Sequence, residues 1–148
     1  MKNAWTGVVL LFVITLPARA SNWLQLTHHD DIEIYADDAS VAKRGKFMQA
    51  WDRTDYPSSQ TMTFAPFKQF RSMKALGYYD CAKKTGALRE LILYAGVGCS
   101  GEVVGHVTIP VDYLEFKAMA SGTVGAVLLN YVCRKKKPLS HKNTDKRK

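Results

Sequence analysis

The sequence predicts an α+β fold in which an antiparallel meander sheet of about six strands carries one C-terminal helix packed on it. Between residues 22 and 118, short stretches of alternating apolar and polar residues follow one another, separated by polar turns. This succession is typical of an antiparallel sheet. The next apolar stretch, Ser121–Cys133, repeats with helical spacing, which predicts one amphipathic helix. We expect this helix to cover one face of the sheet, and the other face to be partly polar or covered by a second copy.

The expected helix has one apolar stripe and a cysteine at its end. Four residues fall at positions i, i+3, i+4 and i+7: Val124, Val127, Leu128 and Tyr131. Ser121 is placed for an N-cap, where its hydroxyl would accept a hydrogen bond from an early backbone N–H, although Gly122 and Gly125 each cost about 1 kcal/mol relative to Ala inside a helix. Because the stretch ends on Cys133, we expect the helix to be stapled to the sheet, with Cys81 as the candidate partner.

Six stretches have the alternation expected of strands, and a seventh is a weaker candidate. In the clearest of them, Ile32 and Ile34 share one face while Glu33 and Tyr35 share the other. The strand stretches are Asn22–Thr27, Asp31–Ala36, Gly45–Tyr56, Lys68–Leu76, Gly86–Ala95 and Glu102–Pro110, with Asp112–Ala118 as the weaker candidate. Turn-forming residues between them predict turns or loops at His28–Asp31, Asp37–Ser40, Pro57–Pro66 and Gly96–Gly101.

The first twenty residues have the pattern of a secretory signal peptide. Lys2 precedes the apolar run Val8–Leu16, and Ala18-Arg19-Ala20 matches a small-x-small cleavage site. The alternative is a membrane anchor, but the apolar run is shorter than the roughly 20 residues that a spanning helix needs. We therefore expect a mature chain that begins near Ser21 and is periplasmic or secreted. No cysteine directly follows the apolar run, so we expect neither a lipid anchor nor a membrane span in the mature chain.

The basic charge of the chain is concentrated in its last fifteen residues. The sequence has a formal net charge of +8, yet residues 21–133 contain eleven Lys and Arg against twelve Asp and Glu, whereas residues 134–148 contain eight Lys and Arg and one Asp. A segment this polar, without apolar periodicity, predicts a disordered tail. Its positive charge would attract anionic glycans or lipopolysaccharide, with no specific nucleic acid; the alternative is a solubilising tail with no dedicated partner. The expected polyanion-binding residues are Arg134, Lys135, Lys136, Lys137, Lys142, Lys146, Arg147 and Lys148.

Three cysteines in an exported protein predict one disulfide and one unpaired thiol. A bridge between Cys81 and Cys133 would close a loop of 52 residues, which contributes about 4 kcal/mol in the chain-entropy model. The alternative is an envelope enzyme or redox protein that uses Cys99 as a nucleophile with His106 as its base. The sequence supplies no third orienting group for this pair, and a reactive thiol would be at risk of oxidation in that compartment. We therefore expect a protein that is not an enzyme, with no catalytic residue and no cofactor.

Three further motifs have a structural and a functional interpretation. The stretch Gly96–Gly101 is a literal G-x-G-x-x-G, but a strand follows it where a dinucleotide site needs a helix, so we expect a hairpin turn. His28-His29-Asp30-Asp31 has the residue types of a metal site, but adjacent residues of an extended chain point to opposite faces, so we expect a solvated turn and no metal. A set of aromatic residues suggests either a binding surface or, as is more common in strands, packing between strands. The set comprises Trp51, Tyr78, Tyr79 and Tyr94.

The order of several short motifs resembles the surface-adhesin protein E-like domain family of Gram-negative bacteria. The matching residues are Trp23, Glu33-Ile34-Tyr35-Ala36-Asp37, Ala39-Ser40, Gly45, Trp51, Ser72, Lys74, Tyr79-Asp80-Cys81, Tyr94, the stretch Gly101–Pro110, and Ser121 with Cys133. The resemblance covers nearly all of residues 22–133. It identifies residues 21–133 as one such domain, between the signal peptide (1–20) and the tail (134–148).

The resemblance implies a disulfide between Cys81 and Cys133, with Cys99 unpaired, and self-association into homodimers. It also implies a non-enzymatic interaction module, since named members of the family are adhesins for host extracellular-matrix proteins. We therefore expect a protein partner, either a host matrix protein or an envelope protein. Three features depart from the better-known surface members: the missing lipidation cysteine, the third cysteine and the basic tail.

Overall fold

The computed structural model describes residues 20–29, 31–62 and 68–135 of the chain. The expected signal peptide, apart from Ala20, and the tail beyond Lys135 lie outside the described residues. Within the described ranges, the single α-helix falls short of the length and apolar character that crossing a bilayer requires.

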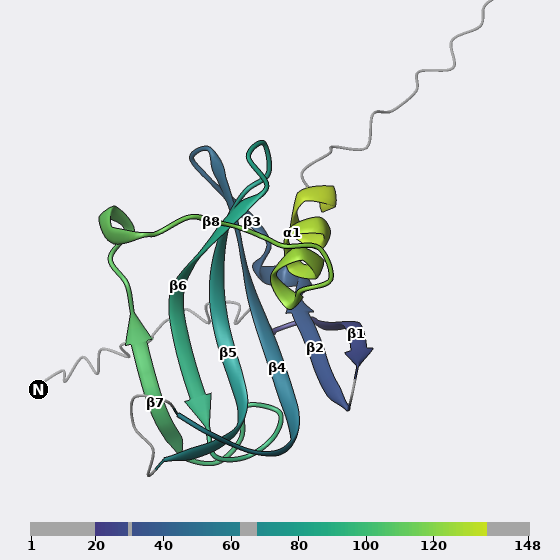
Figure 1. Cartoon of the computed structure of the whole chain (residues 1–148), viewed down its shortest axis with the longest axis vertical. Coiled ribbons are helices and arrows are strands. Elements are labelled where there is room, and N and C mark those ends of the chain that lie inside the picture. The colour runs from purple at the N-terminus through teal and green to yellow at the C-terminus, as the bar shows by residue number, and fades with distance from the viewer. Residues whose placement is uncertain (1–19, 30, 63–67, 136–148) are drawn as a thin grey trace, which may run out of the picture.

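Six strands form one antiparallel sheet, in the order β1-β2-β4-β5-β6-β7 (Figure 1). Their bounds are β1 Trp23–His29, β2 Ile32–Asp37, β4 Phe47–Thr61, β5 Gln69–Asp80, β6 Thr85–Tyr94 and β7 Val103–Thr108. Two short strands lie off this path: β3 Ala42–Arg44 pairs with β4, and β8 Lys117–Ala118 pairs with β6. Two short 3-10 helices, η1 Asp38–Ser40 and η2 Val111–Tyr113, complete the described elements. The predicted meander of about six strands is therefore confirmed.

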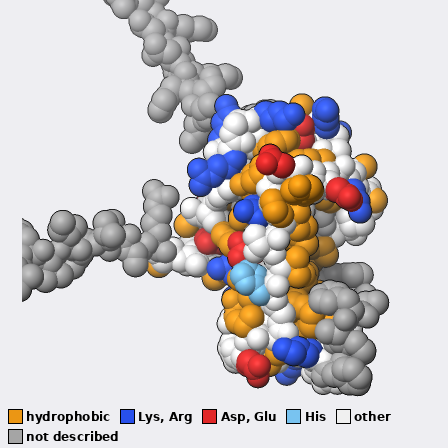
Figure 2. Space-filling model, turned by 90° about the vertical axis from the view of Figure 1, so that its left-hand side faces the viewer, with side chains coloured by type: hydrophobic (Ala, Val, Ile, Leu, Met, Phe, Trp, Pro, Cys, Tyr) orange, Lys and Arg blue, Asp and Glu red, His pale blue; other side chains and the backbone are white. Residues whose placement is uncertain are grey.

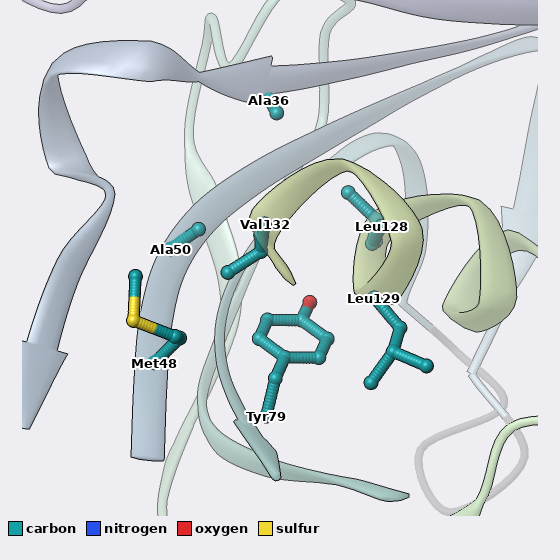
Figure 3. Close-up of a cluster of buried hydrophobic side chains, with 7 residues drawn as sticks. All are labelled: Ala36, Met48, Ala50, Tyr79, Leu128, Leu129 and Val132. Carbon is teal, nitrogen blue, oxygen red and sulfur yellow. The ribbon is translucent and has the colours of Figure 1, made fainter. Parts of the chain in front are cut away.

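The single α-helix, α1 Val124–Lys135, packs across one face of the sheet at the end where β4 begins and β5 ends (Figures 1 and 3). The core beneath it consists of Ala36, Met48, Ala50, Tyr79, Leu128, Leu129 and Val132. Ala36 and Ala50 are small, which lets the helix approach the strands, while the ring of Tyr79 points up between Val132 and Leu129 (Figure 3). Burying this apolar surface, at about 25 cal/mol per Å², holds the helix on the sheet.

The helix begins later than the sequence analysis predicted. Gly122 takes a φ of 81°, which interrupts any helix starting at Ser121. The N-cap is Thr123 instead, whose Oγ1 accepts a hydrogen bond from the N–H of Ala126 at 3.3 Å. The predicted stripe is also shifted. Leu128 is buried as expected, but the other buried residues are Leu129 and Val132, and Val124 is exposed.

The helix also ends later than predicted, because it continues two residues past Cys133. Arg134 and Lys135, which we had assigned to the tail, form its last turn. Positive side chains are favoured there by the partial negative charge at a helix C-terminus. Lys135 Nζ lies 2.6 Å from Asp38 Oδ1, which fastens this turn to η1.

The disulfide between Cys81 and Cys133 is present and confirms the predicted pairing, with 5.6 Å between the two Cα atoms. It joins the residue that follows β5 to the last turns of α1, 52 residues further along the chain. The helix is therefore held to the sheet covalently at one end and by apolar packing along its length.

The strands differ from their predicted bounds mainly where polar residues continue the pairing between strands. β1 includes His28 and His29, which we had placed in a turn. β4 continues through the expected loop from Pro57 to Thr61, because a shift of register between Asp55 and Gln60 keeps it paired with β5. The weak strand candidate Asp112–Ala118 is mostly η2 and irregular chain, with only the two residues of β8 paired.

Candidate functional site: the open face of the sheet

The sheet face opposite α1 is not covered by the helix, and we call it the open face. Because side chains alternate along a strand, the neighbours of the helix-facing residues point the other way. Ala36 and Ala50 face α1, so Tyr35 and Trp51 lie on the open face. The register places Tyr35 of β2 opposite Arg53 of β4, and Arg53 opposite Lys74 of β5.

Two cations and three aromatic rings form one continuous cluster on the open face, which we call the cation–aromatic ladder. Its members are Trp23, Tyr35, Trp51, Arg53 and Lys74, all partly exposed. The guanidinium carbon of Arg53 lies 4.0 Å from the centroid of the Tyr35 ring and 5.4 Å from that of Trp23. The Lys74 ammonium lies 4.5 Å from the centroid of Trp51 and 5.8 Å from that of Trp23. Trp23 therefore contacts both cations and joins the two halves of the cluster.

The ladder holds two positive charges directly opposite each other on neighbouring strands, an arrangement that destabilises a sheet unless it is compensated. Each cation lies over aromatic rings, and each such contact contributes about 0.5–2 kcal/mol depending on exposure. Arg53 also has an ion pair, with 3.1 Å between its Nε and Asp55 Oδ2. No described carboxylate pairs with Lys74, whose positive charge is compensated by the rings alone.

The acidic residues at the edge of the ladder orient Tyr35 and Arg53. The Tyr35 hydroxyl donates a hydrogen bond to Glu33 Oε2 at 2.8 Å, and this bond raises the pKa of Tyr35 above its ordinary value, with a smaller contribution from burial. Tyr35 is therefore neutral at physiological pH, and its ring stays available to Arg53.

The turn Gly96–Gly101 folds onto one end of the open face. The Gly98 N–H donates to Asp55 Oδ1 at 2.8 Å, and the Cys99 N–H donates to Ser72 Oγ at 2.9 Å. The Ser72 hydroxyl in turn donates to the Gly96 carbonyl at 2.6 Å. Two backbone amides that a nucleotide phosphate would need are thus used within the protein, and β7 follows the turn. The predicted hairpin turn is confirmed.

Cys99, which is part of this turn, carries a free and half-buried thiol. Burial raises its pKa, and the nearby Asp55 adds to the increase against the opposing effect of Arg53. A protonated thiol is a weak nucleophile. The candidate base, His106, has its Nε2 at 2.8 Å from Glu90 Oε1, and in the described part of the chain no hydrogen bond joins it to Cys99. The geometry therefore does not favour the catalytic alternative.

A shallow cavity of about 330 Å³ lies where the ladder meets this turn. Its lining mixes charges of both signs, with Glu33, Asp55, Arg53 and Arg71 around the ring of Tyr35. The described residues contain no group of three or more His, Cys, Asp or Glu side chains placed to hold a metal ion. The lining can therefore form hydrogen bonds and ion pairs with groups of either charge.

The structure separates the aromatic residues that the sequence analysis grouped. Tyr79 lies in the core under α1, whereas Trp51 is part of the ladder on the opposite face. Tyr78 makes an edge contact with Phe47, with 6.5 Å between ring centroids. The sequence analysis missed Trp23, Tyr35 and Arg53 as one cluster. Alternation alone could have placed Arg53 on the face of Trp51, but only the strand register brings the three together.

Of the eight tail residues predicted to bind polyanions, Arg134 and Lys135 end α1. The other six, Lys136, Lys137, Lys142, Lys146, Arg147 and Lys148, lie outside the described residues.

Comparison with known proteins agrees with this architecture. The family described as Surface-adhesin protein E matches residues 23–134 of the chain. Two solved structures of Haemophilus influenzae protein E are similar at 11% sequence identity. One has a TM-score of 0.54 and covers 80% of this chain and 88% of that chain. The other, crystal form II, has a TM-score of 0.56 and covers 86% and 98%. No curated protein sequence matches this chain.

Proposed function

Because this chain belongs to the surface-adhesin protein E family, we propose that it is an exported, non-enzymatic interaction module that binds a host extracellular-matrix protein or an envelope protein. We assign the contact surface to the open face, and we place the mature protein in the periplasm or outside the cell. The family membership is the observation that supports this class of function. The cation–aromatic ladder is the observation that supports the choice of surface.

The ladder has the residue types that contribute most to protein interfaces. Trp, Tyr and Arg are the side chains most often found at energetic hot spots, and the ladder contains two Trp, one Tyr and one Arg within one cluster. On the covered face Tyr79 is buried under α1, and among the described strand residues of that face the aromatic rings contact no Lys or Arg. This difference favours the open face as the contact surface.

The ladder is also ordered before any partner binds. Arg53 is fixed by two rings and by Asp55, and a side chain that is already fixed loses little conformational entropy on binding. Immobilising a flexible side chain at an interface otherwise costs about 0.5–1.5 kcal/mol. A partner that presents carboxylates and apolar groups would meet a surface already arranged for it.

The test measures binding of the mature protein to a panel of purified matrix proteins and to envelope fractions. We expect Trp51→Ala to weaken binding by at least tenfold, because hot-spot truncations cost about 2 kcal/mol or more, and Lys74→Gln to weaken it less. Lys117→Gln is the matched control, since Lys117 is exposed and away from the ladder. Circular dichroism verifies that each variant is folded. Unchanged binding by Trp51→Ala and Lys74→Gln together would refute the assignment to the open face.

The proposal includes a separate role for the basic tail. Its net charge of +7 over residues 134–148 supports binding of anionic glycans or lipopolysaccharide by counterion release. We expect a chain that ends at Lys135 to lose heparin retention while its binding to the matrix protein survives. Equal retention of both chains on heparin would reject the tail's role.

Export is the premise of this function and has its own measurement. We expect cleavage after Ala20, and N-terminal sequencing of the exported protein should find Ser21 first. A chain that retains Met1 would instead support the membrane anchor.

A further inference from the structure

Met119 lies between two glycines, one in the sheet and one in the helix. Gly86 belongs to β6, and Gly125 belongs to the first turn of α1. A Cβ atom at Gly86 would collide with Cε of Met119, and a Cβ atom at Gly125 would collide with its Sδ. The end of the Met119 side chain therefore fills a gap that exists because neither glycine has a side chain, and it packs the first turn of α1 against β6.

The two ends of α1 are held to the sheet by different contacts. Near the C-terminal end, Cys133 is bonded covalently to Cys81. In the first turn, the N-cap hydrogen bond comes from Thr123, the residue that precedes the helix. Among the described residues, no hydrogen bond or ion pair joins residues 124–127 to a strand. The first turn therefore depends on apolar packing, and Met119 connects it to β6.

The Met119 side chain is partly exposed and lines two cavities. One, of about 680 Å³, lies between the start of β6 and the loop that contains Tyr113. The other, of about 330 Å³, lies beside the first turns of α1. The loop is on the β7 side of the molecule (Figure 1). Figure 2 shows this side, where hydrophobic side chains are exposed to solvent between charged ones. A small solute therefore reaches Met119 without any unfolding.

The other methionines of the described ranges are less open to an oxidant. Met48 and Met62 are 7% and 5% exposed. Met73 is partly exposed, but its sulfur accepts a hydrogen bond from the Tyr56 hydroxyl at 3.6 Å. This bond engages a lone pair that oxidation of the sulfur would use. Met119 should therefore be oxidised first.

We propose that Met119 is an oxidation site, and that its conversion to methionine sulfoxide releases the first turn of α1 from the sheet. The oxidant is a hydroperoxide, of which hydrogen peroxide is the simplest. A lone pair of the sulfur attacks one peroxide oxygen, so that an S–O bond forms as the O–O bond breaks. The second oxygen leaves as water with both protons. The sulfide loses the two electrons that the peroxide gains.

Oxidation removes this packing because it makes the side chain polar. A sulfoxide disrupts the apolar contacts that methionine makes, and its oxygen is unfavourable in an apolar site without a hydrogen-bond donor. The oxidised side chain should turn into one of the two cavities, where water solvates it. Gly86 and Gly125 have no side chain to fill the vacated space, and unfilled space destabilises the elements that line it. The first turn is then released, while the disulfide keeps the last turns in place.

The test is amide hydrogen exchange, resolved by residue with NMR, on the mature chain before and after treatment with hydrogen peroxide. A Cys99→Ser background removes the free thiol. The helix bonds the amides of residues 127–130 to the carbonyls of residues 123–126. After oxidation we expect these amides to exchange at least about tenfold faster, with the amides of residues 132–135 unchanged. Unchanged exchange in a chain oxidised at Met119 overturns the proposal.

Peptide mapping and two variants test the choice of methionine. Mapping should find the added oxygen at Met119 before it appears at Met73, and the reverse order overturns the assignment. Met119→Leu cannot form a sulfoxide and has a similar apolar volume, so peroxide should leave its exchange unchanged. Met73→Leu is the matched control and should respond to peroxide as the wild type does. A Met119→Leu protein whose helix also loosens in peroxide shows that the proposal is wrong.

Reduction of the sulfoxide provides a check that needs no substitution at Met119. Methionine sulfoxide reductases A and B together reduce both epimers of the sulfoxide. Their action on the oxidised chain should restore the original mass and the slow exchange of residues 127–130 together. Fast exchange that persists after the mass has returned would assign the loosening to other damage and overturn the proposal.

Discussion

The two faces of the sheet hold their polar groups in different ways. On the covered face, α1 and its apolar core exclude water, and the buried carboxyl of Asp52 lies there with no ion-pair partner among the described residues. On the open face, two cations lie over aromatic rings and remain partly exposed. Burial therefore determines stability on the first face, while the second keeps its charged groups accessible to a partner.

Four changes, to the covered face, the open face or the tail, test this difference by their effect on the free energy of unfolding. They are given from the largest expected effect to the smallest.

Removing the disulfide should lower the free energy of unfolding the most, because α1 is then no longer bonded covalently to the sheet. Cys133→Ser is expected to lower the free energy of unfolding by about 2–5 kcal/mol, as loss of a native bridge does in small secreted domains. Urea unfolding of the oxidised proteins measures it. Cys99→Ser is the matched control, because Cys99 is not bridged, and it should change stability far less. Equal losses for the two variants would contradict the stapled helix.

Neutralising Asp52 should stabilise the covered face at high pH. Burial raises the pKa of Asp52 to about 7, from 3.8 for an unburied carboxyl. The folded state then binds more protons than the unfolded state between these values, so stability should fall as pH rises from about 4 to 7. At 1.36 kcal/mol for each pKa unit, the loss is at most about 4 kcal/mol.

Asp52→Asn should therefore be more stable than the wild type at pH 8, with a flatter dependence of stability on pH. Unfolding in urea at pH 4, 6 and 8 measures the difference. A wild type that gains stability between pH 4 and pH 7, with Asp52→Asn showing the same profile, would show that other carboxyls dominate.

Changing the ladder should affect stability little although it affects binding. Lys74→Met removes a cation–ring contact of about 0.5–2 kcal/mol but also relieves the repulsion with Arg53, which lies directly opposite. The two effects oppose each other, so we expect a net change in unfolding free energy within about 1 kcal/mol. Thermal unfolding measures it, with Lys117→Met as the exposed control. A loss of several kcal/mol would mean that the ladder is part of the core.

Removing the tail should have the smallest effect on stability. A chain ending at Lys135 keeps the ion pair between Lys135 and Asp38 and loses six Lys and Arg and one Asp. We expect its unfolding free energy to stay within about 0.5 kcal/mol of the full chain, the usual range for surface changes. Denaturant unfolding of both chains at equal ionic strength decides it.

Much of the fold was predictable because its signals are local. Alternation located the six strands, and it placed Phe47, Gln49 and Trp51 on one face of β4. The cysteine at the end of an apolar stretch indicated the stapled helix. The errors occurred where a local signal was overridden. Gly122 at positive φ delayed the start of the helix to Val124, and the pairing with β5 kept Pro57–Thr61 in a strand despite its loop-like composition.

The sequence by itself determined the order of the strands along the chain, the two faces of each strand, and a C-terminal helix held on the sheet by a disulfide. Each of these depends on residues within a few positions of one another or on the chemistry of one residue type. Only the tertiary structure decided that Trp23, Arg53 and Lys74 lie together and that β7 is an edge strand. It also decided that the Asp55 carboxylate accepts a hydrogen bond from the turn before β7. These depend on which strands are neighbours and in which register, and residues far apart in the chain are brought together only when the sheet forms.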